Sequence, residues 1–207
     1  MHSIDPQSLQ IYFQDKLDRF GTTPRGVDWN SNEAQEVRFA QLARVIRDPG
    51  EPYSLLDYGS GFGTLYDFLR RLGHQTTYTG YDFVPDMVRK GHESHPDDPL
   101  CTFSGDEGGL QPVNYAVASG IFNIRLESSE VDWRDYVLSI LGRMNELTDK
   151  GFAFNMLTSY SDAEYMKPHL YYADPCFYFD YCKRHFSKSV ALLHDYGLYD
   201  FTILVRK

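Results

Sequence analysis

Hydrophobic and polar positions along the chain predict strands and helices that alternate from residue 50 onward. Short runs rich in apolar and β-branched residues are typical of buried strands, and they occupy residues 53–57, 76–82, 100–104, 115–119, 151–157, 189–194 and 201–205. Between some of these runs apolar residues recur every three or four positions, as on one face of a helix. The clearest such stretch contains Trp133, Val137, Ile140, Leu141 and Met144.

Two further helices are predicted ahead of this alternation. The first covers about residues 6–20 and should end at Gly21, a residue type that commonly terminates helices. The second should begin at Asn30, because Asn30 and Glu33 have the spacing of a capping box. At the other end of the chain only residues 195–200 separate the last two strands, so these strands are expected to form an antiparallel hairpin.

The segment from Asp57 to Gly63 carries the strongest chemical signal. A strand ends in a carboxylate, glycines follow at 59, 61 and 63, and a helical pattern begins directly afterwards. Glycines lack a β-carbon, so a ligand can lie against the backbone of such a loop. Open α/β sheets bind ligands at the carboxyl ends of their strands, next to helix N-termini. The segment therefore predicts a nucleotide-type cofactor site.

Two classes of cofactor compete for such a loop. The dinucleotide fingerprint G-x-G-x-x-G requires a glycine where this chain has Thr64. The observed order instead resembles motif I of the class I S-adenosylmethionine-dependent methyltransferases, [D/E]-x-G-x-G-x-G, matched by Asp57, Gly59, Gly61 and Gly63. The resemblance implies S-adenosylmethionine as cofactor, bound by these four residues and Ser60.

A second carboxylate, Asp82, ends the next predicted strand 19 residues after Gly63. The segment that follows this strand resembles the second motif of the same family, in which an acid binds the ribose hydroxyls. The resemblance implies that Asp82 has this role and that Phe83 and Met87 enclose the adenine. The alternative for Asp82 is a plain helix cap. After the third strand, Asp106, with Glu107 as its neighbour, would accept from the adenine amino group, unless it belongs to a solvated turn.

The resemblance also assigns the methionine end of the cofactor and the acceptor. Ser119, Gly120 and Ile121, after the fourth strand, should pass near the methionine, and Arg38 can pair with its carboxylate unless it is a solvated helix residue. The expected acceptor pocket draws on the residues Tyr12, Trp29, Asn123, Tyr160, His169 and Tyr172. The catalytic candidates are His169 as a base, Asn123 and Tyr160.

The family's fold is the expected one: a Rossmann-like, seven-stranded, mostly parallel sheet with one antiparallel strand from the C-terminal hairpin, and helices on both faces. Five strand–helix alternations would precede the hairpin. Residues 1–207 should form a single domain, in which 1–49 provide a helical lid over the cofactor and 50–207 the core. A monomer or a homodimer is expected.

Composition narrows the range of partners. The formal net charge of −9 argues against nucleic acid, whose phosphates require Lys and Arg surfaces. No apolar stretch approaches membrane-spanning length and no signal sequence is recognisable, so a cytoplasmic protein is expected. The three cysteines lack paired metal-ligand spacing, and no metal is expected.

The leading hypothesis is methyl transfer from S-adenosylmethionine to a nitrogen or oxygen of a small molecule. A regulatory protein that binds the same cofactor without catalysis is the main alternative, since both would keep the glycine loop and Asp82. A nicotinamide-dependent oxidoreductase is a third hypothesis, disfavoured by the residue at position 64.

Overall fold

The computed structural model of the protein describes residues 4–27, 29 and 31–207. Its centre is a seven-stranded sheet in the order β3-β2-β1-β4-β5-β7-β6. The strands are β1 Tyr53–Tyr58, β2 Thr76–Tyr81, β3 Cys101–Ser104, β4 Val113–Ala118, β5 Thr148–Leu157, β6 Ser189–Leu193 and β7 Asp200–Arg206. All neighbours are parallel except β7, which is antiparallel to β5 and to β6. The predicted α/β fold and C-terminal hairpin are confirmed.

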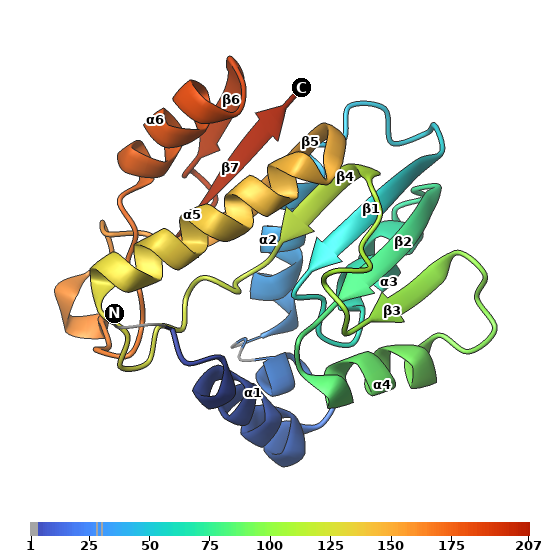
Figure 1. The fold of residues 1–207 in the computed structure, drawn as a ribbon, viewed down its shortest axis with the longest axis horizontal. Coiled ribbons are helices and arrows are strands. Elements are labelled where there is room, and N and C mark those ends of the chain that lie inside the picture. The colour runs from blue at the N-terminus through green and yellow to red at the C-terminus, as the bar shows by residue number, and fades with distance from the viewer. Residues whose placement is uncertain (1–3, 28, 30) are drawn as a thin grey trace.

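Helices cover both faces of the sheet and its carboxyl edge. They are α1 Pro6–Phe20, α2 Asn32–Ala43, α3 Thr64–Arg71, α4 Pro85–Ser94, α5 Glu130–Glu146 and α6 Pro175–His185, with short 3-10 helices at Pro24–Val27 and Ala163–Tyr165. Figure 1 shows α5 crossing one face, α2 and α3 behind the other, and α1 beyond the carboxyl ends of β1 and β4. In the described part of the chain no helix has the length and apolarity needed to cross a membrane.

Two local predictions need correction. Helix α2 begins at Asn32, because the Ser31 hydroxyl accepts the Ala34 N–H at 3.2 Å and caps the helix there. The predicted cap Asn30 lies outside the described residues. The expected five strand–helix alternations are four, since β3 connects to β4 through the non-helical residues 105–112, where two adjacent glycines disfavour a helix.

Two apolar clusters, one on each face of the sheet, hold the carboxyl edge in place. On the α5 side, Trp133 is fully buried and donates its indole N–H to the Phe122 carbonyl at 2.8 Å. This bond fixes the loop that leaves β4. On the other side, α2 and α3 pack Leu42 and Leu69 against Leu55 of β1. The loops at this edge therefore rest on a closely packed base.

Two glycines provide a matched test of the packing. At Gly151 the backbone φ is 150°, and an added β-carbon would lie 2.3 Å from the Val205 carbonyl oxygen of β7. We expect Gly151→Ala to lower the free energy of unfolding by about 2–4 kcal/mol, since β5 and β7 must separate. Gly142→Ala, on α5 with open space around it, should raise that free energy by about 0.5–1 kcal/mol. Urea denaturation of both variants measures these changes, and similar effects of the two would contradict the strand packing.

Candidate active site

A cavity of about 870 Å³ lies at the carboxyl edge of the sheet. Its walls come from α1 and α2, from the loops after β1, β2 and β4, and from residues 167–170. The predicted site residues that line it are Tyr12, Trp29, Arg38, Asp57, Gly59, Ser60, Gly61, Asp82, Phe83, Met87, Glu107, Ser119, Gly120, Ile121, Asn123 and His169. Gly63, Asp106, Tyr160 and Tyr172 lie outside it.

The glycine loop after β1 has left-handed backbone at each of its three glycines. Their φ angles are 81°, 54° and 92° at Gly59, Gly61 and Gly63, a region that side chains with a β-carbon rarely adopt. Gly59 and Gly61 face the cavity, whereas a β-carbon at Gly63 would lie 2.6 Å from the Phe103 ring. Gly63 is therefore needed for the packing against Phe103 and for the start of α3. It does not form part of the cavity wall.

Asp82 holds two loop segments together and also lies at the cavity. Its carboxylate accepts the N–H groups of Gly61 at 2.8 Å and Val84 at 2.9 Å, and it also lines the cavity. It therefore braces the glycine loop while it keeps lone pairs for a ligand. Burial raises the pKa of Asp82 to about 6, against the opposing effect of the two N–H donors.

Asp57 has a buried oxygen without a partner. One carboxylate oxygen accepts the Tyr78 hydroxyl at 2.7 Å, and the other has no hydrogen bond among the described residues. Burial raises the pKa of Asp57 to about 7, because the charged form loses its hydration. The Ser119 hydroxyl, across the same cavity, also lacks a partner there. An orphaned buried acceptor costs free energy, so both atoms fit a ligand that supplies N–H or O–H groups.

At the end of β3 the structure distinguishes between two neighbouring acids. Asp106 accepts the Gly108 N–H at 3.0 Å and closes its own exposed turn, as in the alternative interpretation. Glu107 instead lines the cavity and accepts the Tyr58 hydroxyl at 2.5 Å. The shift by one residue follows from the turn, which uses the Asp106 side chain to satisfy its own backbone.

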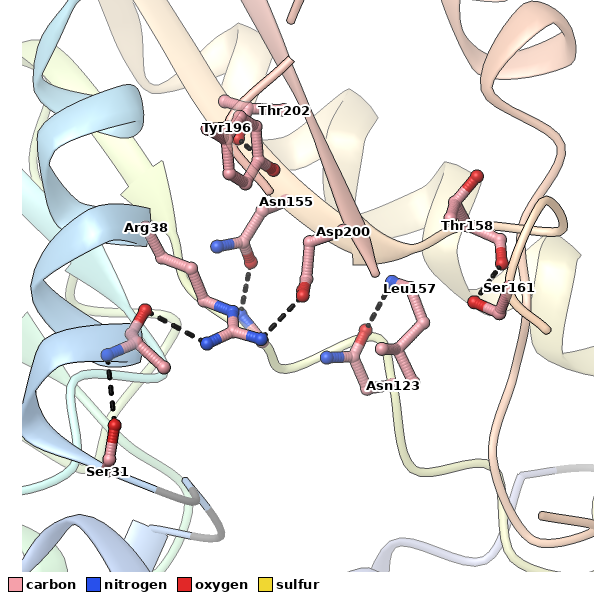
Figure 2. A network of polar contacts seen from close by, with 12 residues as sticks. Ser31, Arg38, Asn123, Asn155, Leu157, Thr158, Ser161, Tyr196, Asp200 and Thr202 are labelled. Atoms are coloured by element: carbon pink, nitrogen blue, oxygen red, sulfur yellow. Dashed lines mark hydrogen bonds and ion pairs between the residues drawn. The ribbon is translucent and has the colours of Figure 1, made fainter. Parts of the chain in front are cut away.

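Arg38 forms a buried ion pair rather than a solvated side chain. Its guanidinium lies 2.5 Å from the carboxylate of Asp200, and these side chains are 9% and 0% exposed (Figure 2). The same guanidinium donates to the Ala34 carbonyl at 2.9 Å and lies 4.3 Å from the centre of the Trp29 ring. Burial raises the pKa of Asp200, and the charge of Arg38 opposes that effect. The Nε of Arg38 has no partner among the described residues.

Asn123 is oriented by the backbone of β5. Its side-chain oxygen accepts the Leu157 N–H at 3.0 Å, so the amide NH₂ must point the other way, toward the side where Arg38 lies (Figure 2). Since Asn123 lines the cavity, it presents donors to a ligand there. Nearby, the Gly120 N–H donates to Asn155 at 2.7 Å, which fixes the backbone of the β4 exit loop.

Two aromatic residues expected in the acceptor pocket are elsewhere. Tyr160 is 68% exposed, and its ring lies 5.9 Å from that of His194. Tyr172 accepts the backbone N–H of Lys167 at 3.0 Å and so supports the chain behind the cavity wall. The sequence pattern placed both residues after β5 but contained no signal for the direction of their side chains.

The cavity also contains residues that the sequence analysis did not identify. Tyr58 and Lys167 line the cavity. Asp200 does not line it but forms the ion pair with Arg38, which does. Asp200 and Arg38 are 162 positions apart, so no local motif connects them. Among the described residues no cluster of three His, Cys, Asp or Glu side chains is arranged to hold a metal ion.

Comparison with known proteins places the chain among methyltransferases. No protein-family model matches it. The Mycobacterium tuberculosis protein named "Putative methyltransferase Rv1506c" is 49% identical over 166 residues, which cover 78% of this chain and 98% of that protein.

Two solved structures show the same fold. Magnesium protoporphyrin IX methyltransferase of Synechocystis PCC 6803 with bound SAH has a TM-score of 0.65 at 14% identity, covering 98% of this chain and all of that one. The 1,6-didemethyltoxoflavin-N1-methyltransferase of Burkholderia thailandensis, with bound 1,6-didemethyltoxoflavin and S-adenosylhomocysteine, has a TM-score of 0.64 at 17% identity, covering 97% and 89%.

The raised pKa of Asp57 predicts a pH-dependent effect of Asp57→Asn. Asp57 has a pKa of about 7 in the native state, against an ordinary value of 3.8. The contribution of this carboxyl group to stability therefore falls as the pH rises between these two values. Without ligand, Asp57→Asn should raise the free energy of unfolding at pH 8 by roughly 2 kcal/mol, and the gain should shrink toward pH 5. Denaturation at both pH values, with Asp106→Asn as exposed control, measures this; a gain independent of pH would contradict it.

Proposed function

The chain belongs to the class I S-adenosylmethionine-dependent methyltransferases, and from this premise we propose that it methylates a nitrogen or oxygen atom of a small molecule. The observation that carries the proposal is the continuity of one cavity. It joins the glycine loop and Asp82, at one end, to Asn123 and His169, at the other. A cofactor and an acceptor placed in it would therefore meet within the same cavity.

The residues present fit the cofactor. In this proposal Asp82 accepts the ribose hydroxyls, Phe83 and Met87 flank the adenine, and Glu107 takes the role first expected of Asp106. The unpartnered oxygen of Asp57 suits the amino group of the methionine part, beside Gly59 and Gly61 in the cavity lining.

The far end of the cofactor would lie beside the wall that Ser119, Gly120 and Ile121 form after β4. Its carboxylate would be held by Arg38, whose Nε still lacks an acceptor. Bound S-adenosylmethionine supplies a methyl group on a sulfonium, which needs no further activation.

The protein's own contribution is then position, exclusion of water and proton transfer. The amide NH₂ of Asn123 is fixed by Leu157 and would orient an acceptor oxygen. His169 would accept the proton of a hydroxyl or ammonium acceptor, a step that commonly contributes 10²–10⁴-fold when the acceptor is protonated. Tyr160 is not part of this proposal, because it lies outside the cavity.

Helix α1 would act as the lid. Leu9 and Leu17 are buried beneath it, Tyr12 faces the cavity, and Gln14 donates to Asp86 of α4 at 2.9 Å. With α1 and Trp29 over the carboxyl edge, the site suits a small acceptor better than a polymer. This is why a small molecule, rather than a protein or nucleic acid, is proposed.

Formation of S-adenosylhomocysteine tests the function directly. Incubation with S-adenosylmethionine and a library of small amines, phenols and hydroxy acids should yield a methylated product that is detectable by mass spectrometry. Tight binding of S-adenosylhomocysteine without any turnover would favour the non-catalytic alternative. Calorimetric preference for NAD over S-adenosylhomocysteine would instead favour an oxidoreductase.

Two neighbouring acid sites give a matched test of the ribose anchor. We expect Asp82→Ala to weaken S-adenosylhomocysteine binding by about 2–3 kcal/mol, the scale for losing charge-assisted hydrogen bonds in a buried site. Asp106→Ala, outside the cavity, should change the affinity by less than twofold. Calorimetric titration measures both. Equal effects of the two substitutions would contradict a role of Asp82 in cofactor binding. An unchanged affinity together with a much lower melting temperature in Asp82→Ala would show that Asp82 has only a structural role.

The proposed base can be tested once an acceptor is found. His169→Gln should reduce kcat by 10²-fold or more for a hydroxyl acceptor, because the proton then lacks a positioned acceptor. Affinity for S-adenosylhomocysteine should stay within twofold of wild type. Tyr160→Phe, on an exposed ring outside the cavity, is the control and should retain full turnover. An unchanged kcat in His169→Gln would remove this residue from the mechanism.

A further inference from the structure

One wall of the cavity is a β-turn whose carbonyl groups are all hydrogen-bonded to other parts of the protein or within the turn. In the turn Lys167–Leu170 the N–H of Leu170 donates to the Lys167 carbonyl at 3.1 Å. Pro168 occupies the second position, where its restricted φ favours the turn. Lys167, which is exposed, and His169, which is half-buried, both line the cavity.

Arg125 secures the remaining carbonyl groups of this turn. Its guanidinium donates to the Pro168 carbonyl at 2.7 Å and to the Leu170 carbonyl at 3.2 Å. Its backbone N–H donates to the His169 carbonyl at 3.0 Å. Every carbonyl of the turn is thus hydrogen-bonded, and three of the four bind Arg125.

The chain around Arg125 is itself constrained. The guanidinium also donates to the Ser128 carbonyl at 2.6 Å. Leu126 has a φ of 51°, which is uncommon for a residue other than glycine and costs free energy. Its N–H donates to His169 at 3.1 Å. Strain of this kind persists only where surrounding contacts determine the backbone, so we interpret the turn as preorganised.

Charged residues of both signs line the cavity, and several of the cations are already paired. Arg19 pairs with Asp15, and Arg143 pairs with Glu146. The acids Asp57, Asp82 and Glu107 line the end proposed for the nucleoside. Arg38 is already paired with Asp200. Lys167, at the other end, has no carboxylate within ion-pair distance among residues 4–27, 29 and 31–207. In a chain of net charge −9, this uncompensated cation is a local site of attraction for an anion.

We propose that the acceptor carries an anionic group, a carboxylate or a phosphate monoester, which Lys167 binds, and that Arg125 positions this residue by holding the turn. The proposal rests on the proposed function, since it assigns the acceptor end of the same cavity. The anchored group would leave the reacting atom near His169, two residues further along the turn, and near the amide of Asn123. Lys167 would thus select acceptors that carry an anionic group, and Arg125 would keep Lys167 in position.

Binding of paired probes to the protein saturated with S-adenosylhomocysteine tests the anchor. Benzoate and phenyl phosphate are compared with neutral benzyl alcohol by NMR titration at low salt. At least one anionic probe should bind tenfold or more tightly than benzyl alcohol, and its identity decides between carboxylate and phosphate. Lys167→Met should reduce the preference to below threefold. Lys188→Met, an exposed lysine outside the cavity, should preserve it.

Equal binding of anionic and neutral probes, or a preference that survives in Lys167→Met, would overturn the proposal. Loss of the preference only in Arg38→Ala would also overturn it, because the anchor would then be Arg38. Binding of S-adenosylhomocysteine is measured first in each variant and should stay within twofold for Lys167→Met. A protein that fails to bind this compound contradicts the proposed function instead, so the two failures are distinguishable.

Arg125→Lys tests the positioning role. Lysine keeps the charge but lacks the fork that reaches several carbonyls at once. The amides of Leu126 and Leu170, which donate to the carbonyls of His169 and Lys167, should exchange with solvent at least tenfold faster. The preference for anionic probes should fall, while affinity for S-adenosylhomocysteine is retained. Arg184→Lys, in an exposed pair with Asp180, is the matched control. Unchanged exchange and unchanged preference would show that Arg125 does not position the turn.

Discussion

Arg38 and Asp200 form an ion pair that joins α2 to the start of β7, next to the cavity. Removing two charges from water costs several kcal/mol for each, and mutual attraction offsets this only with good geometry and further hydrogen bonds. The pair has both, since Arg38 also binds the Ala34 carbonyl and lies against Trp29. The loss of either partner would leave a buried charge, so the position of α2 against β7 depends on this contact.

The same region holds polar atoms that lack partners within the described protein. They are Arg38 Nε, Asp57 Oδ1, Ser119 Oγ, Asn155 Nδ2 and Asp200 Oδ1, together with Asn145 Oδ1 elsewhere. Buried polar groups are normally satisfied, and each exception lowers stability. Their concentration at the cavity indicates that this edge is built for a polar ligand rather than for maximal stability. The raised pKa values of Asp57 and Asp82 reflect the same cost, because burial disfavours their charged forms.

The walls of the cavity differ in how firmly they are held. The turn at residues 167–170 is fixed by hydrogen bonds to all of its carbonyls. Helix α1 is held by apolar contacts of Leu9, Phe13 and Leu17 and by the bond from Gln14 to Asp86. A rigid wall suits recognition, since little entropy is lost when a ligand binds to it. A wall of apolar side chains suits a lid, because such contacts can break and re-form without leaving polar groups unsatisfied.

The sequence by itself determined the strands, most of the helices, the hairpin and the glycine loop with Asp82. These features depend on periodicity and on the spacing of neighbouring residues, which hold wherever the segment lies in the fold. Only the tertiary structure decided that Glu107 rather than Asp106 lines the cavity, and that Tyr160 and Tyr172 lie outside it. It also decided the partners of Arg38 and Arg125. Such outcomes depend on side-chain direction and on contacts between distant segments, such as the 162 positions between Arg38 and Asp200, and local patterns carry no information about these.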